Sequence, residues 1–92
     1  MTVGVLRLSL IIPYSFSLKD KRRVIKSLMQ KIRNRFNVSI REEPNNSWNF
    51  CQVTIAAVDT GPPNLSALFE KLKEFIENDG RVEILEHDID YY

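Results

Sequence analysis

Side chains that could perform catalysis or bind a metal are few in this sequence and lie far apart along it. The chain has one histidine, His87, and one cysteine, Cys51. His87 stands between two acids, but a single histidine among carboxylates is a weak metal signal. Cys51 has no histidine near it in sequence, which favours a small buried apolar filler over a nucleophile. We therefore expect no catalytic residue, no metal site and no cofactor, and a protein that is not an enzyme.

Other patterns typical of active sites are also missing. Glu42 and Glu43 are adjacent, so in a strand their side chains face opposite ways and do not form an acid/base pair. Ser17 is sufficiently explained as the N-cap of a helix. The glycines at positions 4, 61 and 80 are too far apart to form a phosphate-cradling loop.

The strongest chemical signal is the distribution of charge. Ten of the 13 Lys and Arg residues fall within the first 41 positions beside one acid, Asp20, which gives this stretch a charge of +9. The remaining residues hold three basic and eleven acidic side chains, a charge of −8, and the formal net charge is +1. Such asymmetry points to a polyanion on one side of the molecule, or to a partner of complementary charge.

The size and composition predict one soluble globular domain over residues 1–92. Hydrophobic residues make up 43% of the chain and charged residues 27%, which is ordinary for this class. A lone cysteine excludes an internal disulfide and is compatible with a reducing cytoplasm. The apolar segment Val3–Ile12 contains Arg7 and Ser9, lacks a preceding basic region and is too short for a membrane span. We expect a cytoplasmic protein without membrane contact.

The patterns along the chain predict the element order β-α-β-β-α-β. Even positions of Val3–Ile12 are uniformly aliphatic, which indicates a strand with one deeply buried face. A long amphipathic helix over Leu18–Phe36 follows the Ser17 cap, with Asp20 in a capping-box-like position and Asn37 as a left-handed stop. The later elements are a strand over Val38–Arg41, a turn at Pro44–Ser47, a strand over Trp48–Val58, a helix from Gly61-Pro62-Pro63 to Gly80, and a strand over Val82–Ile89.

This order predicts an α+β, ferredoxin-like two-layer sandwich. Two right-handed β-α-β crossovers give a four-stranded antiparallel sheet with both helices on one face. The other sheet face is then open. Because Val5, Ile11, Phe50 and Leu85 are predicted to lie on it, a homodimer formed through this face is favoured over a monomer with scattered apolar residues. Base stacking on this sheet is not expected, since only Phe50 among its central residues is aromatic.

The first helix carries its basic residues on one side. At 100° per residue, Lys19, Arg22, Arg23, Lys26 and Arg33 fall within a sector of about 100°, and we call these five residues the basic stripe. Clustered Lys and Arg on a helix are typical of surfaces that bind phosphate backbones. The alternatives are a solvated face, or pairing with Glu70, Glu74 and Glu77 of the second helix. Trp48 is interpreted either as a partner anchor or as a cap on the edge of the core.

Two segments resemble a known family. Residues 17–22 (Ser-Leu-Lys-Asp-Lys-Arg) and 33–39 (Arg-Asn-Arg-Phe-Asn-Val-Ser) are similar to the signature of the YlxP-like family, small bacterial proteins of unknown function. Pro13, the Glu42-Glu43 pair and the Trp48 region are similar as well, so the resemblance spans nearly the whole chain. It implies a ferredoxin-like fold and a bacterial cytoplasmic protein. Family members are often encoded beside translation-initiation and ribosome-maturation genes, and no catalytic residues are established for them.

Three functional classes remain from the sequence. The first is an accessory factor that binds structured RNA or a ribosomal particle through the basic stripe. The second is a homodimeric interaction module that binds an acidic protein and no nucleic acid. The third, an enzyme or sensor for a small molecule, has no supporting group of residues in the sequence.

Overall fold

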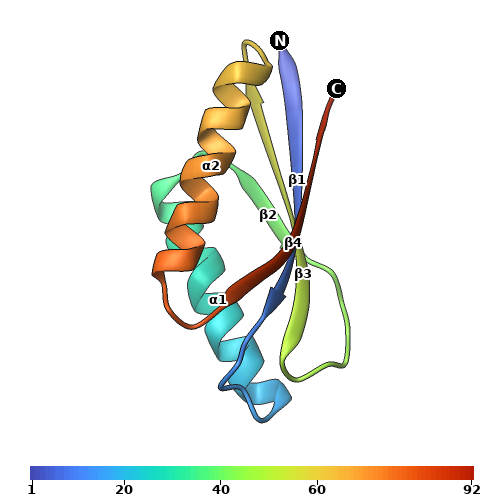
Figure 1. The fold of residues 1–92 in the computed structure, drawn as a ribbon, viewed down its shortest axis with the longest axis vertical. Helices are drawn as coiled ribbons and strands as arrows, with labels where there is room; N and C mark the ends of the chain where they lie inside the picture. The colour runs from blue at the N-terminus through green and yellow to red at the C-terminus, as the bar shows by residue number, and fades with distance from the viewer.

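The protein folds as one antiparallel sheet with two helices packed on one of its faces. The computed structural model describes all residues from Met1 to Tyr92. Its elements are β1 (Thr2–Ile11), α1 (Leu18–Arg35), β2 (Ser39–Glu42), β3 (Phe50–Asp59), α2 (Pro62–Asn78) and β4 (Glu83–Tyr91). The strand order is β2-β3-β1-β4, and both helices lie on the same side of the sheet (Figure 1). The predicted ferredoxin-like fold is confirmed.

The central strand β1 follows its sequence alternation. Leu6, Leu8 and Leu10 are buried beneath the helices, whereas Arg7 and Ser9 face the open side of the sheet. β1 pairs antiparallel with β3 from Thr2 opposite Asp59 to Ile11 opposite Phe50. Because side chains alternate with a period of two, this register places the apolar positions of both central strands on the helix side.

Helix α1 begins as the sequence predicts but ends differently. The Ser17 side chain accepts a hydrogen bond from the Asp20 backbone N–H at 3.0 Å. At the other end Phe36 leaves the helix in an extended conformation, and no non-glycine residue has a positive φ. The predicted left-handed stop at Asn37 is therefore wrong. Phe36 packs edge-on against Phe75 of α2, at 5.5 Å between ring centroids, and this contact accompanies an extended exit into β2.

Helix α2 and the last strand close the core. α2 buries Leu65, Phe69, Leu72 and Ile76, and Gly80 terminates the helical segment with a φ of 81°, as predicted. Strand β4 begins one residue after the buried Val82, a small shift from its predicted start.

Strand β4 also departs from prediction at its middle and its end. Leu85 is an extra residue in the pairing with β1, because Ser9 lies opposite Glu86 and Leu10 opposite Ile84. The last residue, Tyr92, exchanges two backbone hydrogen bonds with Val3, at 2.8 and 2.9 Å. The carboxyl end is therefore held in the sheet. Neither helix is both long and apolar enough to cross a bilayer.

Gly4 provides a test of how closely the second helix packs on the sheet. A Cβ atom at this position would lie 2.8 Å from Phe69 Cε2 and 3.2 Å from Leu65 Cδ1. We expect Gly4→Ala to lower the free energy of unfolding by about 1–3 kcal/mol, because the packed core must shift to admit the methyl group. Urea denaturation measures this difference.

Gly61→Ser is the matched control for Gly4→Ala. Gly61 is the N-cap of α2, its backbone is extended, and its nearest contact would be an ordinary 3.7 Å. Serine is a favoured N-cap residue, so this variant should be as stable as the wild type or slightly more stable. Equal urea midpoints for Gly4→Ala and wild type would contradict the close approach of α2 to β1.

Candidate nucleic-acid interface

The basic stripe lies on the outer surface of α1. Lys19, Arg22, Arg23 and Lys26 are all exposed, and none of their side chains forms an ion pair or a hydrogen bond within the protein. Arg33 differs, because its guanidinium donates to the backbone carbonyl of Ile40 at 3.0 Å. Four members of the stripe are therefore free to bind a ligand, and the fifth ties the end of α1 to β2.

The acids of α2 do not neutralise the stripe. Glu70 pairs with Lys73 of its own helix at 2.7 Å. The ion pair that links the two helical segments joins Lys31 to Asp79 at 3.8 Å, and neither residue belongs to the stripe. The stripe residues therefore form no ion pairs with the acids of α2, which was one of the alternatives for these charges.

The reason is the rotation of α1 about its axis. Lys31 contacts the end of α2, and the Arg35 guanidinium lies 5.4 Å from the centre of the Phe75 ring. On the helical wheel these two positions are far from Lys19 and Lys26, which project on the opposite side of α1. The fold therefore turns the basic stripe away from the acids of α2.

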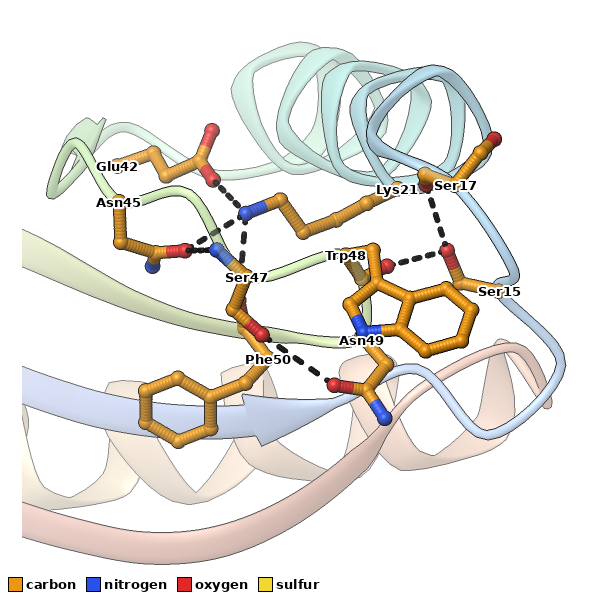
Figure 2. A network of polar contacts seen from close by, with 9 residues as sticks. All are labelled: Ser15, Ser17, Lys21, Glu42, Asn45, Ser47, Trp48, Asn49 and Phe50. Atoms are coloured by element: carbon orange, nitrogen blue, oxygen red, sulfur yellow. Dashed lines mark hydrogen bonds and ion pairs between the residues drawn. The ribbon is translucent and has the colours of Figure 1, made fainter.

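A buried lysine fixes α1 against the loop formed by residues 43–49, which we call the hairpin loop. Lys21 is only 2% exposed and occupies the core-facing side of α1 together with Ile25, Leu28 and Ile32. Its Nζ donates to Asn45 Oδ1 at 2.9 Å and to the Phe50 carbonyl at 3.3 Å, and it lies 3.9 Å from Glu42 Oε2 (Figure 2). The desolvation of this ammonium is offset by three oxygen partners.

A buried serine joins the same loop to the start of α1. Ser15 Oγ donates to the backbone carbonyl of Trp48 and also lies 3.1 Å from the Ser17 carbonyl (Figure 2). Asn45 Oδ1 accepts from the Ser47 backbone N–H at 2.9 Å, which fixes the turn itself. Sequence reasoning missed Lys21 and Ser15. The spacing of Lys21 from Ile25, Leu28 and Ile32 could have revealed the first of them.

The open sheet face is polar at its centre. Arg7 forms ion pairs with Asp90 at 2.9 Å and Asp88 at 3.5 Å. A shallow hollow of about 480 Å³ there is lined by Arg7, Asp88, Glu43 and Glu86 among others. Carboxylates at this site oppose the approach of a polyanion.

The predicted dimer residues are separated by this polar centre. Ile11 and Phe50 are register partners at one end of the face, and Val5 lies toward the other end. These three side chains are half-buried, whereas Leu85 at the bulge is 53% exposed. The structure does not bring the four residues into one continuous apolar patch, and a homodimer through this face stays a prediction.

The candidate catalytic side chains are not brought together. Cys51 is fully buried in the core, and burial is the first cause that raises the pKa of its thiol from 9.0 to about 12, with Glu42 adding to the effect. His87 is exposed opposite Leu8 on the edge strand. No group of three or more His, Cys, Asp or Glu side chains is placed to hold a metal ion.

These features define a small ferredoxin-like α+β protein with a free cationic helix face. Residues 3–89 match the family described as "Protein of unknown function (DUF503)", and the chain belongs to this family. It is 30% identical over 82 residues to the "Uncharacterized protein YlxP" of Bacillus subtilis (strain 168). The aligned region covers 88% of this chain and 89% of that protein. The YlxP-like assignment made from the sequence is confirmed.

A solved structure shares the fold. The "De novo designed protein Foldit4" superposes with a TM-score of 0.55 at 18% sequence identity, over 100% of this chain and 97% of that chain. At this identity the similarity concerns the fold alone.

The role of Lys21 can be tested by removing its charge while keeping its length. We expect Lys21→Met to lower the free energy of unfolding by about 1–3 kcal/mol, because Asn45 Oδ1 and the Phe50 carbonyl lose their donor. The control Lys19→Met alters an exposed side chain and should change stability by less than about 0.5 kcal/mol. Urea denaturation followed by far-UV circular dichroism measures both, and an undiminished stability of Lys21→Met would contradict this role.

The burial of Cys51 predicts a thiol that is protected in the folded protein. Its raised pKa keeps the folded thiol neutral up to about pH 12, so labelling by a disulfide reagent at pH 8 should be at least about 100-fold slower than in urea. The unfolded thiol ionises above about pH 9, so this group leaves stability unchanged below pH 9 and lowers it as the pH rises from 9 toward 12. Equal labelling rates with and without urea would show that Cys51 is accessible.

Proposed function

We propose that this protein is a non-catalytic cytoplasmic factor that binds structured RNA through the basic stripe of α1. One observation carries the proposal: four neighbouring cationic side chains, Lys19, Arg22, Arg23 and Lys26, are exposed and have no anionic partner in the protein. Phosphate groups supply that partner, and cationic clusters along a helix are typical of surfaces that bind them.

The electrostatic cost of the stripe supports this interpretation. Like charges three or four residues apart, such as Arg22 and Lys26, destabilise a helix by a few tenths of a kcal/mol per pair. The chain holds 12 acidic side chains, and yet none of them is paired with these four cations. A bound phosphate backbone removes the repulsion, and release of condensed counterions favours the complex further.

The dimensions of the stripe fit a nucleic-acid strand. With a rise of 1.5 Å per residue, Lys19 and Lys26 lie about 10 Å apart along the helix axis. Successive phosphates of one strand advance by about 3.4 Å along the axis of a DNA duplex, and A-form RNA is somewhat more compact, so the four side chains can reach three or four phosphates. Binding through phosphates is tolerant of sequence.

The distribution of acids orients the complex. Glu83, Glu86, Asp88 and Asp90 lie along the edge strand β4, on the other side of the sheet from β2 in strand order. An RNA bound at α1 is therefore attracted to one flank of the molecule and repelled from the opposite one. This asymmetry steers the RNA to the α1 flank of the protein.

Binding of fluorescent structured RNA at 50, 100 and 200 mM salt tests the proposal. Four phosphate contacts predict a log–log slope of roughly −3 to −4, at about −0.7 to −0.9 per contact. The double variant Arg22→Glu/Lys26→Glu should abolish binding without lowering the urea midpoint, since both residues are exposed and unpaired. Fluorescence anisotropy measures the affinity.

Lys71→Glu/Lys73→Glu is the control of equal charge change. These residues lie on α2, away from the stripe, but Lys73 pairs with Glu70, so the urea midpoint of this variant is measured first. In urea-free buffer, where it is folded, the variant should keep at least half of the wild-type affinity at each salt concentration. Equal losses in both double variants would mean that net charge alone governs binding. An absence of binding at 50 mM salt, or full binding by Arg22→Glu/Lys26→Glu, would overturn the proposal, and the second result would leave the stripe as a solvated or protein-facing surface.

A further inference from the structure

Three large aromatic side chains are exposed at the end of the molecule where α1 begins. Tyr14, Phe16 and Trp48 are 82%, 70% and 48% exposed, and we call them the aromatic patch. Tyr14 and Phe16 belong to the β1–α1 connection, and Trp48 belongs to the hairpin loop. Both segments lie at the end opposite the two chain termini (Figure 1).

The patch does not serve to close the core. Phe36, Phe75 and six smaller hydrophobic residues are half-buried against the core cluster, and no member of the aromatic patch is among them. Phe16 and Trp48 contact each other at 6.4 Å between ring centroids, with their planes tilted by 59°. The rings are thus not stacked on one another, and each keeps much of its surface free. Trp48 does not pack against the core cluster, so its interpretation as a cap on the edge of the core is not supported.

The backbone beneath the patch is held rigidly. The Asp20 carboxylate accepts a hydrogen bond from the Phe16 backbone N–H at 3.2 Å. The buried Ser15 hydroxyl donates to the Trp48 carbonyl, and Lys21 anchors the hairpin loop through Asn45. Aromatic rings presented on a fixed backbone lose little conformational freedom when a ligand binds.

The patch adjoins the basic stripe at Tyr14. Tyr14 and Arg23 line the same shallow hollow, of about 270 Å³, together with Asp20 and Arg81. Arg22 lines a second hollow with Asn45 and Asn46 of the hairpin loop and with Glu42 of β2, whose carboxylate lies 3.9 Å from Lys21 Nζ. An aromatic side chain and a free cation therefore occur side by side at Tyr14 and Arg23, and the hairpin loop that carries Trp48 borders Arg22.

We propose that the aromatic patch stacks unpaired bases of the RNA whose phosphates contact the basic stripe. The preferred ligand is then RNA with a loop or single-stranded extension beside its helical part. The inference rests on the proposed function and narrows its substrate class. Paired bases are stacked within a duplex and do not expose their faces, whereas unpaired bases stack on aromatic side chains irrespective of sequence.

The test compares three fluorescent probes: a blunt RNA duplex, the same duplex with a six-nucleotide single-stranded extension, and a twelve-nucleotide single strand. We expect Phe16→Ala/Trp48→Ala to weaken binding of the two probes with unpaired bases by at least roughly fivefold, and binding of the blunt duplex by less than twofold. Tyr91→Ala/Tyr92→Ala removes two exposed aromatics at the other end of the molecule and should leave all three affinities unchanged. The single variant Trp48→Phe keeps a ring at this position and should retain most of the wild-type affinity for the two probes with unpaired bases.

Wild-type fluorescence gives a second readout, because Trp48 is the only tryptophan. Its emission should be quenched by the probes with unpaired bases and not by the blunt duplex. Binding of all probes with equal affinity and unchanged emission would overturn this inference and leave the phosphate-binding function standing. No binding of any probe, with the Arg22→Glu/Lys26→Glu variant indistinguishable from wild type, would overturn both and direct the search to a protein that docks on the same aromatic patch.

Discussion

The arrangement of the candidate interface depends on one buried charge, the ammonium group of Lys21. An unpaired cation in an apolar core is strongly unfavourable, so this lysine is stable there only while its oxygen partners stay in place. Those partners come from the hairpin loop and from the first residue of β3, namely Asn45 Oδ1 and the Phe50 carbonyl. The requirement acts in both directions: α1 holds the loop, and the loop holds the register of α1 on the sheet. Trp48 belongs to that loop, so the hydrogen bond from Lys21 to Asn45 helps to fix its position.

The topology of the fold converts a charge gradient along the sequence into a charge difference across the molecule. The basic first 41 residues include α1 and most of β2, which lies at one edge of the sheet. The acidic remainder includes α2 and β4, and β4 forms the other edge. Because α1 packs beside the edge strand β2 and β4 forms the opposite edge, the split β-α-β order places the α1 cations and the β4 carboxylates on different flanks of the molecule. The edge carboxylates of β4 also discourage pairing with another strand.

The parts of the fold that follow local periodicity were predictable from the sequence, and the parts that depend on tertiary contacts were not. The alternation in β1, the Ser17 cap and the glycine end of α2 at Gly80 are each fixed by residues close together in the chain. Burial of Lys21 was not anticipated, because its partners lie more than twenty residues away and a lysine among basic residues is ordinarily exposed. The β4 bulge at Leu85 depends on pairing with β1, and no local pattern marks it. For the site, membership of the basic stripe was predicted from helical spacing, whereas the internal use of Arg33 and the proximity of Phe16 to Trp48 required the assembled fold.

The scaffold and the candidate binding surface use different residues, and this separation has a physical consequence. The free stripe cations and the aromatic rings are exposed, so their contributions to folding are small and, for the stripe, unfavourable. Ser15 and Lys21 are buried and contribute to folding. They do not contact a ligand themselves but fix the backbone that presents Phe16, Trp48 and the start of α1. Surface and scaffold therefore meet at Arg33, which is bonded to β2, and at the junction between the β1–α1 connection and the hairpin loop. A change at that junction alters stability and the geometry of the surface together, whereas a change on the exposed surface leaves the fold intact and, under the proposed function, alters affinity alone.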